Sequence, residues 1–474
     1  MKLLFKIFLS VTIALPIMGS AQIQVGSDIN GEAMYDNFGK LIKLSANGSV
    51  LGVISNGTNG KVFVYKNEGG NWGIYGTDAD GEHFNNVVAS GIDLSYDGNT
   101  LALGGGGVSR VYTYDSGIWT QKGNDIPNST TDSSFGTIVN LSNDGNTIAV
   151  SSPTYVTQSS SGRQLPPPID QGMVEIFIYE SGNWNQIGNS IIGYSNEFSG
   201  HSISLSSDGT KIAISNRNSV KIYENMSGVW TILGNEISGV YYEHKQVSLS
   251  SDGTLVVIGD PQYSDGIIQR GRVRIYQYIS NNWIQIGNDI LGQTSYEFAG
   301  EKVSMSSNGN IVAVSFNGNY TIGNNVGQVR IYKNESGNWN QIGDNFNGES
   351  SDDKFGTALS LSKDASTVAI GTPFNDNNGT DAGYVKVYDL STTLSNYTFE
   401  VSQFKLFPNP ATNQFTIQIP QGSKLLKVNM YTLLGQLITS TQKPLIQTKS
   451  FPKGIYLIEI ETDKGKASKK LVIQ

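Results

Sequence analysis

The sequence contains no cysteine among its 474 residues. This absence excludes disulfide bonds, thiolate metal ligands and a cysteine nucleophile together. Common catalytic motifs are missing as well, because no Gly-x-Ser-x-Gly elbow, His-Glu-x-x-His pair or phosphate-binding loop occurs. We therefore predict a protein that is not an enzyme.

Basic residues are scarce over most of the chain. Between residues 22 and 397, 20 lysines and arginines stand against 36 acidic residues. An acidic surface argues against binding to nucleic acids or anionic membranes, since both need a basic face. Residues 398–474 show the opposite balance, with 10 lysines and 4 acidic residues. This contrast predicts two domains with different tasks.

Long apolar runs are also rare, and the best candidate lies at the start of the chain. Met1–Ala21 has two early lysines, a short apolar segment and small residues at its end, which is typical of a secretory signal peptide. A membrane anchor is the alternative, but the apolar run is too short to span a bilayer comfortably. We predict an exported protein whose mature chain begins at Gln22.

The chain after the signal peptide repeats one pattern seven times, with a period of about 50 residues. Each copy has an alternating run ending in Leu-Ser or Met-Ser, a turn, a second apolar run and a third run ending in Tyr. Alternation with period two predicts strands, and the Asp-Gly or Asn-Gly turns of six copies favour short hairpins. The repeats are anchored at Leu44, Leu94, Leu141, Leu205, Leu249, Met305 and Leu361.

A fourth strand begins near a tryptophan in six copies: Trp72, Trp119, Trp184, Trp230, Trp283 and Trp339. We interpret these residues as packing residues of the sheets rather than sugar platforms. The missing seventh copy is at the N-terminus, where Gln22–Ile29 resembles Trp184–Ile191. We infer an all-β, seven-bladed β-propeller over residues 22–395 that is closed by the N-terminal strand. Closure pairs the backbone groups of the edge strands, which an open solenoid of sheets, the alternative, would leave unpaired.

The repeat stops before residues 396–474, which carry a different pattern. Alternating runs predict strands at Gln414–Ile419, Leu425–Tyr431, Leu437–Ser440, Ile455–Ile460 and Lys469–Ile473. These runs predict a small antiparallel, Ig-like β-sandwich.

This segment resembles the C-terminal sorting domain of the type IX secretion system of Bacteroidota. The matching motifs are Phe407–Pro410, Tyr431–Gly435, Pro452–Tyr456 and Lys469–Ile473. The resemblance implies passage through the periplasm and the outer membrane by that machinery, followed by release or attachment at the cell surface. An ordinary adhesive sandwich domain is the alternative.

The repeats themselves resemble the FG-GAP repeats of integrin-type propellers. Phe38-Gly39, Phe135-Gly136 and Phe355-Gly356 match the first half of that motif, and Gly259-Asp260-Pro261 and Gly371-Thr372-Pro373 match the second. The calcium loop common in that family is absent from the first hairpins. A separate loop offers oxygen ligands near Asp376, Asn378 and Asp381, so calcium there is one hypothesis, a polar turn is the other, and no further cofactor is expected.

An acidic residue lies in every segment that joins a fourth strand to the next first strand. These residues are Asp36, Glu82, Asp132, Glu197, Glu243, Glu297 and Asp353. In a propeller such loops gather around one mouth of the central channel, so they could form a ring that binds a cation or a cationic or hydroxyl-rich ligand. The alternative is seven solvated loop acids.

Three further features are open to two interpretations. The long loop Tyr155–Asp170, part of an expanded stretch at residues 153–172, is either a recognition loop or a tolerated insertion. His83, His201 and His244, which fall in successive repeats, are interpreted as structural or surface residues too far apart to share a metal. The Ser-x-Asp-Gly turns are similar to sialidase Asp boxes, but the glycine lies one place early.

The sequence thus predicts a secreted, monomeric binding or adhesion propeller on the outer cell surface. Its ligand would be a surface glycan or protein, with no nucleic acid involved. The alternative function is a carbohydrate-active enzyme, a glycan hydrolase or lyase on the same scaffold, and a surface-layer component is a third.

Overall fold

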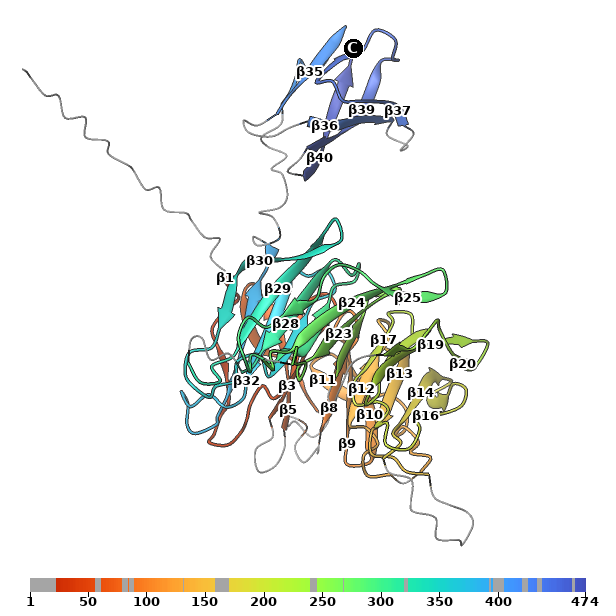
Figure 1. Ribbon diagram of the computed structural model, residues 1–474, viewed down its shortest axis with the longest axis vertical. Coiled ribbons are helices and arrows are strands. Elements are labelled where there is room, and N and C mark those ends of the chain that lie inside the picture. The colour runs from red at the N-terminus through yellow and green to blue at the C-terminus, as the bar shows by residue number, and fades with distance from the viewer. Residues whose placement is uncertain are drawn as a thin grey trace, which may run out of the picture.

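The computed structural model describes residues 23–55, 61–78, 84, 89–130, 132–157, 170–238, 245–266, 268–318, 323–391, 394, 405–419, 425–432, 437–462 and 465–474. The predicted signal peptide lies outside these residues. The described chain is all-β, with almost no helix (Figure 1). No helix in these ranges is long and apolar enough to cross a membrane.

Residues 23–391 form seven sheets, numbered here in chain order. The first contains β3 (Leu41–Leu44), β4 (Val50–Ser55), β5 (Lys61–Glu68) and β6 (Asn71–Ile74). The second contains β7 (Thr77–Asp78), β8 (Gly91–Leu94), β9 (Thr100–Gly105), β10 (Val108–Asp115) and β11 (Ile118–Gln121). The third contains β12 (Ile138–Leu141), β13 (Thr147–Ser152), β14 (Met173–Glu180), β15 (Asn183–Gln186) and β16 (Ile191–Ile192).

The next three sheets follow the same order. The fourth contains β17 (Ile203–Leu205), β18 (Lys211–Ser215), β19 (Ser219–Met226), β20 (Val229–Ile232) and β21 (Ile237–Ser238). The fifth contains β22 (Gln246–Leu249), β23 (Leu255–Asp260), β24 (Arg272–Ile279), β25 (Asn282–Gln285) and β26 (Ile290–Leu291). The sixth contains β27 (Ala299–Met305), β28 (Ile311–Phe316), β29 (Gln328–Glu335) and β30 (Asn338–Asn347).

The seventh sheet joins both ends of this region. It contains β31 (Ala358–Leu361), β32 (Thr367–Thr372) and β33 (Tyr384–Asp389), together with β1 (Ile23–Gln24) and β2 (Ile29–Asn30). Ile23 pairs with Asp389 and Ile29 pairs with Val385, both antiparallel. The predicted pairing of the N-terminal segment with the last repeat is therefore confirmed.

The first strands of the seven sheets contact one another in a closed circuit. The strands in this circuit are β3, β8, β12, β17, β22, β27 and β31, and β31 contacts β3 again. In Figure 1, β3 at the red end of the colour scale accordingly lies beside β32. We call the contact between the first and seventh sheets the closure seam.

Main-chain hydrogen bonds run around the same circuit. In each bond, a residue one or two positions after a Leu-Ser or Met-Ser pair is linked to the corresponding residue of the next sheet. The donor and acceptor pairs are Asn47–Tyr96, Tyr96–Asn143, Asn143–Ser207, Ser207–Ser251, Ser251–Ser307, Ser307–Lys363 and Lys363–Ala46. The last pair crosses the closure seam, so the ring of bonds is complete.

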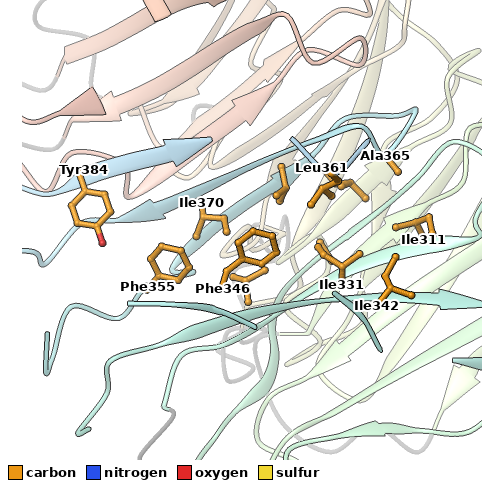
Figure 2. Packing of buried hydrophobic residues seen from close by; sticks show 13 residues of the cluster. Ile311, Ile331, Ile342, Phe346, Phe355, Leu361, Ala365, Ile370 and Tyr384 are labelled. Atoms are coloured by element: carbon orange, nitrogen blue, oxygen red, sulfur yellow. The ribbon is translucent and has the colours of Figure 1, made fainter. Parts of the chain in front are cut away.

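Apolar side chains fill each junction between consecutive sheets, including the closure seam. The seam cluster includes Ile29, Phe38 and Phe63. Figure 2 shows the junction of the sixth and seventh sheets, with Ile311, Ile331, Ile342, Phe346, Phe355, Leu361, Ala365, Ile370 and Tyr384 labelled. The alternating runs of the sequence thus bury their apolar residues between sheets.

The tryptophans link neighbouring sheets, which agrees with their interpretation as packing residues. In five cases the indole N–H donates to a carbonyl of the preceding sheet: Trp119 to Tyr75, Trp184 to Lys122, Trp230 to Ile187, Trp283 to Leu233 and Trp339 to Ile286. The sixth, Trp72, lies at the closure seam, and its buried indole N–H has no hydrogen-bond partner among the residues that the structure describes.

Each first hairpin is closed by its own serine and Asp or Asn side chain. In the third sheet, Ser142 donates to Asp144 (2.5 Å), Asp144 accepts the N–H of Asn146 (3.0 Å), and Ser142 accepts the N–H of Thr147 (2.9 Å). The seven pairs are Ser45–Asn47, Ser95–Asp97, Ser142–Asp144, Ser206–Asp208, Ser250–Asp252, Ser306–Asn308 and Ser362–Asp364. These turns are therefore structural, which accounts for the sequence pattern without an Asp-box function.

The described part of residues 405–474 forms two further sheets. One contains β34 (Lys405–Phe407), β35 (Gln414–Gln418) and β38 (Leu445–Gln447). The other contains β36 (Leu425–Thr432), β37 (Leu437–Thr441), β39 (Gly454–Thr462) and β40 (Gly465–Ile473). A single apolar cluster, which includes Phe415, Met430 and Ile458, lies between them. Asn409 of the Phe-Pro-Asn-Pro motif bonds the main chain of Lys470 (2.8 Å) and Val472 (2.9 Å).

Several short strands of the structure were not predicted from the sequence. β16, β21 and β26 follow the Trp-led strands after a Gly-containing bend and pair with the third strand of their sheets. In β30 the two segments are continuous. β34 and β38 were missed as well, because runs of three residues carry too little alternation to be recognised.

The first prediction concerns the closure seam. Deleting residues 22–30 should expose the edge of β33 and remove Ile29 from its cluster, at a cost of about 3 kcal/mol or more in the free energy of unfolding. Urea denaturation of the chain from residue 22, with and without this deletion, would measure this loss. A synthetic peptide of residues 22–31 added in trans should restore part of it, and an unchanged stability after deletion would contradict the seam.

The second prediction concerns pH. Burial disfavours the charged form of Asp144, but hydrogen bonds from Ser142 and Asn146 outweigh it and hold its pKa below the usual value. Asp97, Asp208, Asp252 and Asp364 behave alike. A depressed pKa stabilises the fold above the unfolded value and loses this contribution as pH falls through the folded value.

Replacing these five aspartates by asparagine should therefore lower stability at neutral pH and flatten its decline as the pH falls below about 4. Asn47 and Asn308 make the same serine bond in the natural chain, so the turn geometry should survive. Urea unfolding across this range would test the idea. Parallel pH profiles for both proteins would show that the turn carboxylates do not drive acid sensitivity.

Candidate functional site

The predicted acidic residues cap their own loops. Asp36 accepts the N–H groups of Glu32 (2.9 Å) and Ala33 (2.8 Å). In three other loops the acid also accepts an N–H three or four residues earlier: Glu197 from Tyr194, Glu297 from Gln293 and Asp353 from Ser350. Asp132 instead accepts the N–H and hydroxyl of Ser134. Glu82 and Glu243 lie outside the described residues.

Three of these acids also tie the loop to its own sheet. Glu197 pairs with Lys221 of β19 (3.1 Å), and Glu297 pairs with Arg330 of β29 (3.3 Å). Glu297 and Arg330 are both buried, at 0% and 2% exposure. A buried pair of this kind is costly to break, because removal of one partner leaves an uncompensated charge.

Asp353 is the third, and it accepts a hydrogen bond from the Asn375 side chain (3.1 Å). Burial raises its pKa above the usual value, against the effect of that bond. The described partners of all five acids lie in the acid's own loop or sheet, and the described residues contain no cluster of three metal-ligating side chains. The structure thus gives these carboxylates a local structural role, and a shared ligand ring stays a prediction.

The predicted calcium loop is organised by internal hydrogen bonds. The carboxylate of Asp376 accepts the N–H of Asp381 (2.8 Å), and Asn375 accepts the N–H of Asn377 (2.9 Å). Gly379 has a positive φ of 127°, which a side chain would rarely adopt. These contacts describe a polar turn. The calcium hypothesis for Asp376, Asn378 and Asp381 stays a prediction.

One predicted acid lies in a broad groove together with the base of the long loop. The groove has a volume of about 840 Å³ and is lined by Ser129, Thr130, Asp132, Ser133, Thr154, Tyr155, Val156 and Thr157. The base of the loop is held in place, because Gln171 donates to the carbonyl of Tyr155 (2.9 Å) and accepts from Thr157 (2.7 Å). Pro166–Pro168, in the rest of that loop, lie outside the described residues.

Exposed tyrosines stand on the same connections as the acids. Tyr35, Tyr194 and Tyr296 are 59%, 75% and 52% exposed. Lys221 lies over the Tyr194 ring, 5.1 Å from its centroid. Sequence reasoning missed these residues, although each lies within three positions of a predicted acid. Exposed aromatic rings beside carboxylates suit ligands with both apolar and hydroxyl-bearing faces.

A smaller cavity of about 150 Å³ contains His201, and it too was missed. Its lining includes Phe198, Asn216 and Lys245. The ammonium of Lys245 donates to the carbonyls of Asn216 (3.0 Å) and Arg217, and burial lowers its pKa to about 8. His83 and His244 lie outside the described residues, so the predicted separation of the three histidines stays a prediction.

Comparison with known proteins identifies a family for the C-terminal part of the chain. Residues 405–474 match the family described as "Secretion system C-terminal sorting domain". The predicted sorting domain is confirmed. It implies interaction with the type IX secretion system, export, and a secreted or cell-surface location. No curated protein sequence matches the chain.

Two solved structures are similar to this chain. Kuenenia stuttgartiensis hydrazine synthase has 13% sequence identity and a TM-score of 0.49, over 78% of this chain and 98% of its own. The β-propeller domain of Myceliophteria thermophila Cps50 (Swd1) has 10% identity and a TM-score of 0.48, over 79% of this chain and 99% of its own. These likenesses carry no information on function. Neither the matched family nor these two structures concerns FG-GAP repeats, so that resemblance stays a prediction.

The third prediction separates structural from ligand-binding acids. Replacing Glu297 by glutamine should destabilise the chain by about 3 kcal/mol, because Arg330 would be left buried without its counter-charge. Asp36→Asn is the matched control, since its loop is exposed and should lose well under 1 kcal/mol. Chemical denaturation of both variants would measure the loss of unfolding free energy in each. Equal stabilities would contradict a structural role for Glu297.

Proposed function

We propose that residues 23–391 form a closed, seven-bladed β-propeller and that the C-terminal pair of sheets is an Ig-like sandwich. Support for the blade number comes from seven sheets, seven apolar junctions and a closed circuit of hydrogen bonds. The outer strand of the last blade is then β1, paired with β33. In this arrangement the described acidic loops and the base of the long loop lie on one face, and the Ser-x-Asp-Gly turns lie on the other.

On this scaffold, the protein would act as a secreted or surface-attached binding module for a hydroxyl-rich ligand, such as a surface glycan. The groove beside Asp132 is the observation that carries this proposal. Its wall offers the hydroxyl oxygens of Ser129, Thr130 and Thr157 and one carboxylate. The three hydroxyls donate to Glu175, Asn128 and Gln171, so these oxygens and the carboxylate would accept hydrogen bonds from sugar hydroxyls. A groove of about 840 Å³ has room for a short oligosaccharide rather than a single small ion.

The exposed tyrosines extend this surface around the same face. Tyr194 keeps 75% of its surface accessible although Lys221 lies against its ring. An aromatic ring of this kind can pack against the apolar face of a sugar ring or against a protein partner. The sorting domain places such a surface outside the cell, where glycans and matrix proteins are present.

A carbohydrate-active enzyme is the second candidate and would need two acids of raised pKa lining one cavity. Burial raises the pKa of Asp260 and of Asp353, in each case against a stabilising partner. Asp260 belongs to the fifth sheet and bonds Arg272, whereas Asp353 precedes the seventh and bonds Asn375. These contacts favour ion-pair and loop-holding roles, and thus favour the binding proposal.

The fourth prediction tests the groove. On glycan and matrix-protein arrays, the purified propeller should bind one class of glycan. Asp132→Asn combined with Tyr155→Ala should weaken this binding at least about tenfold, equivalent to about 1.4 kcal/mol. Tyr194→Ala should weaken it less.

Tyr96→Ala is the matched control, because Tyr96 is exposed but belongs to the opposite, turn-bearing end of its sheet. It should leave binding unchanged. Binding only to a matrix protein would replace the glycan by a protein ligand. Unaltered glycan binding by the groove variant would overturn the proposal.

A further inference from the structure

The central channel is lined at one level by a repeated position. This is the residue immediately before each Leu-Ser or Met-Ser pair: Lys43, Asp93, Asn140, Ser204, Ser248, Ser304 and Ser360. Together with neighbouring residues, including Lys363, they enclose a cavity of about 70 Å³. A cavity of that size holds a few water molecules or one small ion.

Side chains at this level form a ladder between sheets. The oxygen of each accepts the main-chain N–H of the next sheet in the chain, or, at the closure seam, of the first sheet. The bonds run from Leu141 to Asp93, Leu205 to Asn140, Leu249 to Ser204, Met305 to Ser248, Leu361 to Ser304 and Leu44 to Ser360, at 2.6–3.2 Å. One rung is missing, because Lys43 has no oxygen to offer Leu94.

Asp93 compensates for the missing rung. One of its oxygens accepts the N–H of Leu94 (2.8 Å) and the ammonium of Lys43 (2.9 Å). The other accepts from the Asn140 amide (2.5 Å) and the N–H of Leu141 (2.7 Å). Asp93 is 2% exposed, so both carboxylate oxygens are fully used by the protein.

The groups that remain for the cavity are donors. Each ladder serine uses its oxygen as an acceptor and keeps one O–H to donate. In the described part of the chain, the hydroxyls of Ser204, Ser248, Ser304 and Ser360 donate to no protein atom. Lys363 reaches across the channel toward the carbonyl of Leu249 at the long distance of 3.5 Å.

The net charge of the cavity lining is positive, as is the partial charge on the hydrogen atoms of these donors. The charged residues of the described lining are Lys43, Lys363 and Asp93. The Lys43 charge is matched by Asp93, which leaves Lys363 without a counter-charge of its own. Burial, and then repulsion from Lys43, lowers the pKa of Lys363 to about 8, against attraction by Asp93.

We propose that this cavity is a binding site for one small inorganic anion of the halide class. Serine hydroxyls and the Lys363 ammonium would bind it. The cavity is too small for a larger organic acid. Lys43 and Lys363 belong to the first and seventh sheets, so the anion lies at the closure seam and strengthens the junction that holds the ring shut.

The proposal predicts a pH limit. Lys363 must be protonated to bind the anion, and the charged groups that face it from neighbouring elements are Lys43 and Asp93. Anion-dependent stability should therefore be full below about pH 8 and should be lost as pH rises above this value.

The fifth prediction is the test of this site. At constant ionic strength, replacing gluconate with chloride should raise the midpoint of thermal unfolding of the chain from residue 22 saturably, by about 2–4 °C. Lys363→Met should abolish this rise. Lys40→Met removes the same charge from an exposed position of the first sheet and should keep it.

A second measurement keeps the proposal testable if Lys363→Met does not fold. Crystals of the unmodified chain grown in bromide should show one anomalous peak in the channel, within hydrogen-bonding distance of Lys363. A peak absent at saturating bromide would overturn the proposal. So would an equal response to chloride in the unmodified chain and the Lys363→Met variant, since the channel would then hold water only.

Discussion

Closure of the ring is the constraint on which the rest of the large domain depends. Each sheet buries one apolar face against each neighbour, so an unclosed array would leave two faces and a strand edge in water. The chain has no disulfide to hold such an array together. Instead, β1 and β2 pair with β33, and a main-chain bond from Lys363 to Ala46 completes the circuit. Stability is therefore shared around the whole ring.

This constraint explains why so many conspicuous residues have structural partners. Tryptophan indoles, turn aspartates and the buried pair of Glu297 and Arg330 all join parts of a sheet or neighbouring sheets. Such residues repeat because the junction repeats. Residues that do not repeat, such as Tyr155 in the groove beside Asp132, are better candidates for a function specific to this protein.

The seam is also where the repeat is least regular. Within the described ranges Trp72 has no partner for its indole N–H, and Lys43 interrupts the ladder of side-chain acceptors. Both belong to the first sheet, which meets a sheet assembled from the two ends of the region. Asp93 restores the ladder by accepting four hydrogen bonds, and its position between Lys43 and Asn140 leaves the channel with an excess of donors.

Much of the architecture could be predicted, because it follows from the local periodicity of the sequence. Alternation gave the strands, the Asp-Gly pairs gave the hairpins, and the match of Gln22–Ile29 to a Trp-led strand predicted the pairing of β1 with β33. Short strands such as β16 and β34 were missed since two or three residues carry no period. The sorting domain was found because its motifs are contiguous in the chain.

The candidate sites were predicted less well, for a physical reason. Sequence position identified Asp132 and Glu297 alike as loop acids. Only the fold separates them: Glu297 is buried against Arg330, whereas Asp132 lines an open groove. Ligand contacts and burial depend on residues far apart in the chain, as in the meeting of Lys43, Asp93 and Lys363.

By itself, then, the sequence determined the strands, the repeat, the route of export and the partner of the first strand, because each can be recognised from a motif within a short contiguous stretch. The tertiary structure alone decided which polar groups are satisfied and which face a cavity, because hydrogen-bond partners are set by the packing of seven separate sheets.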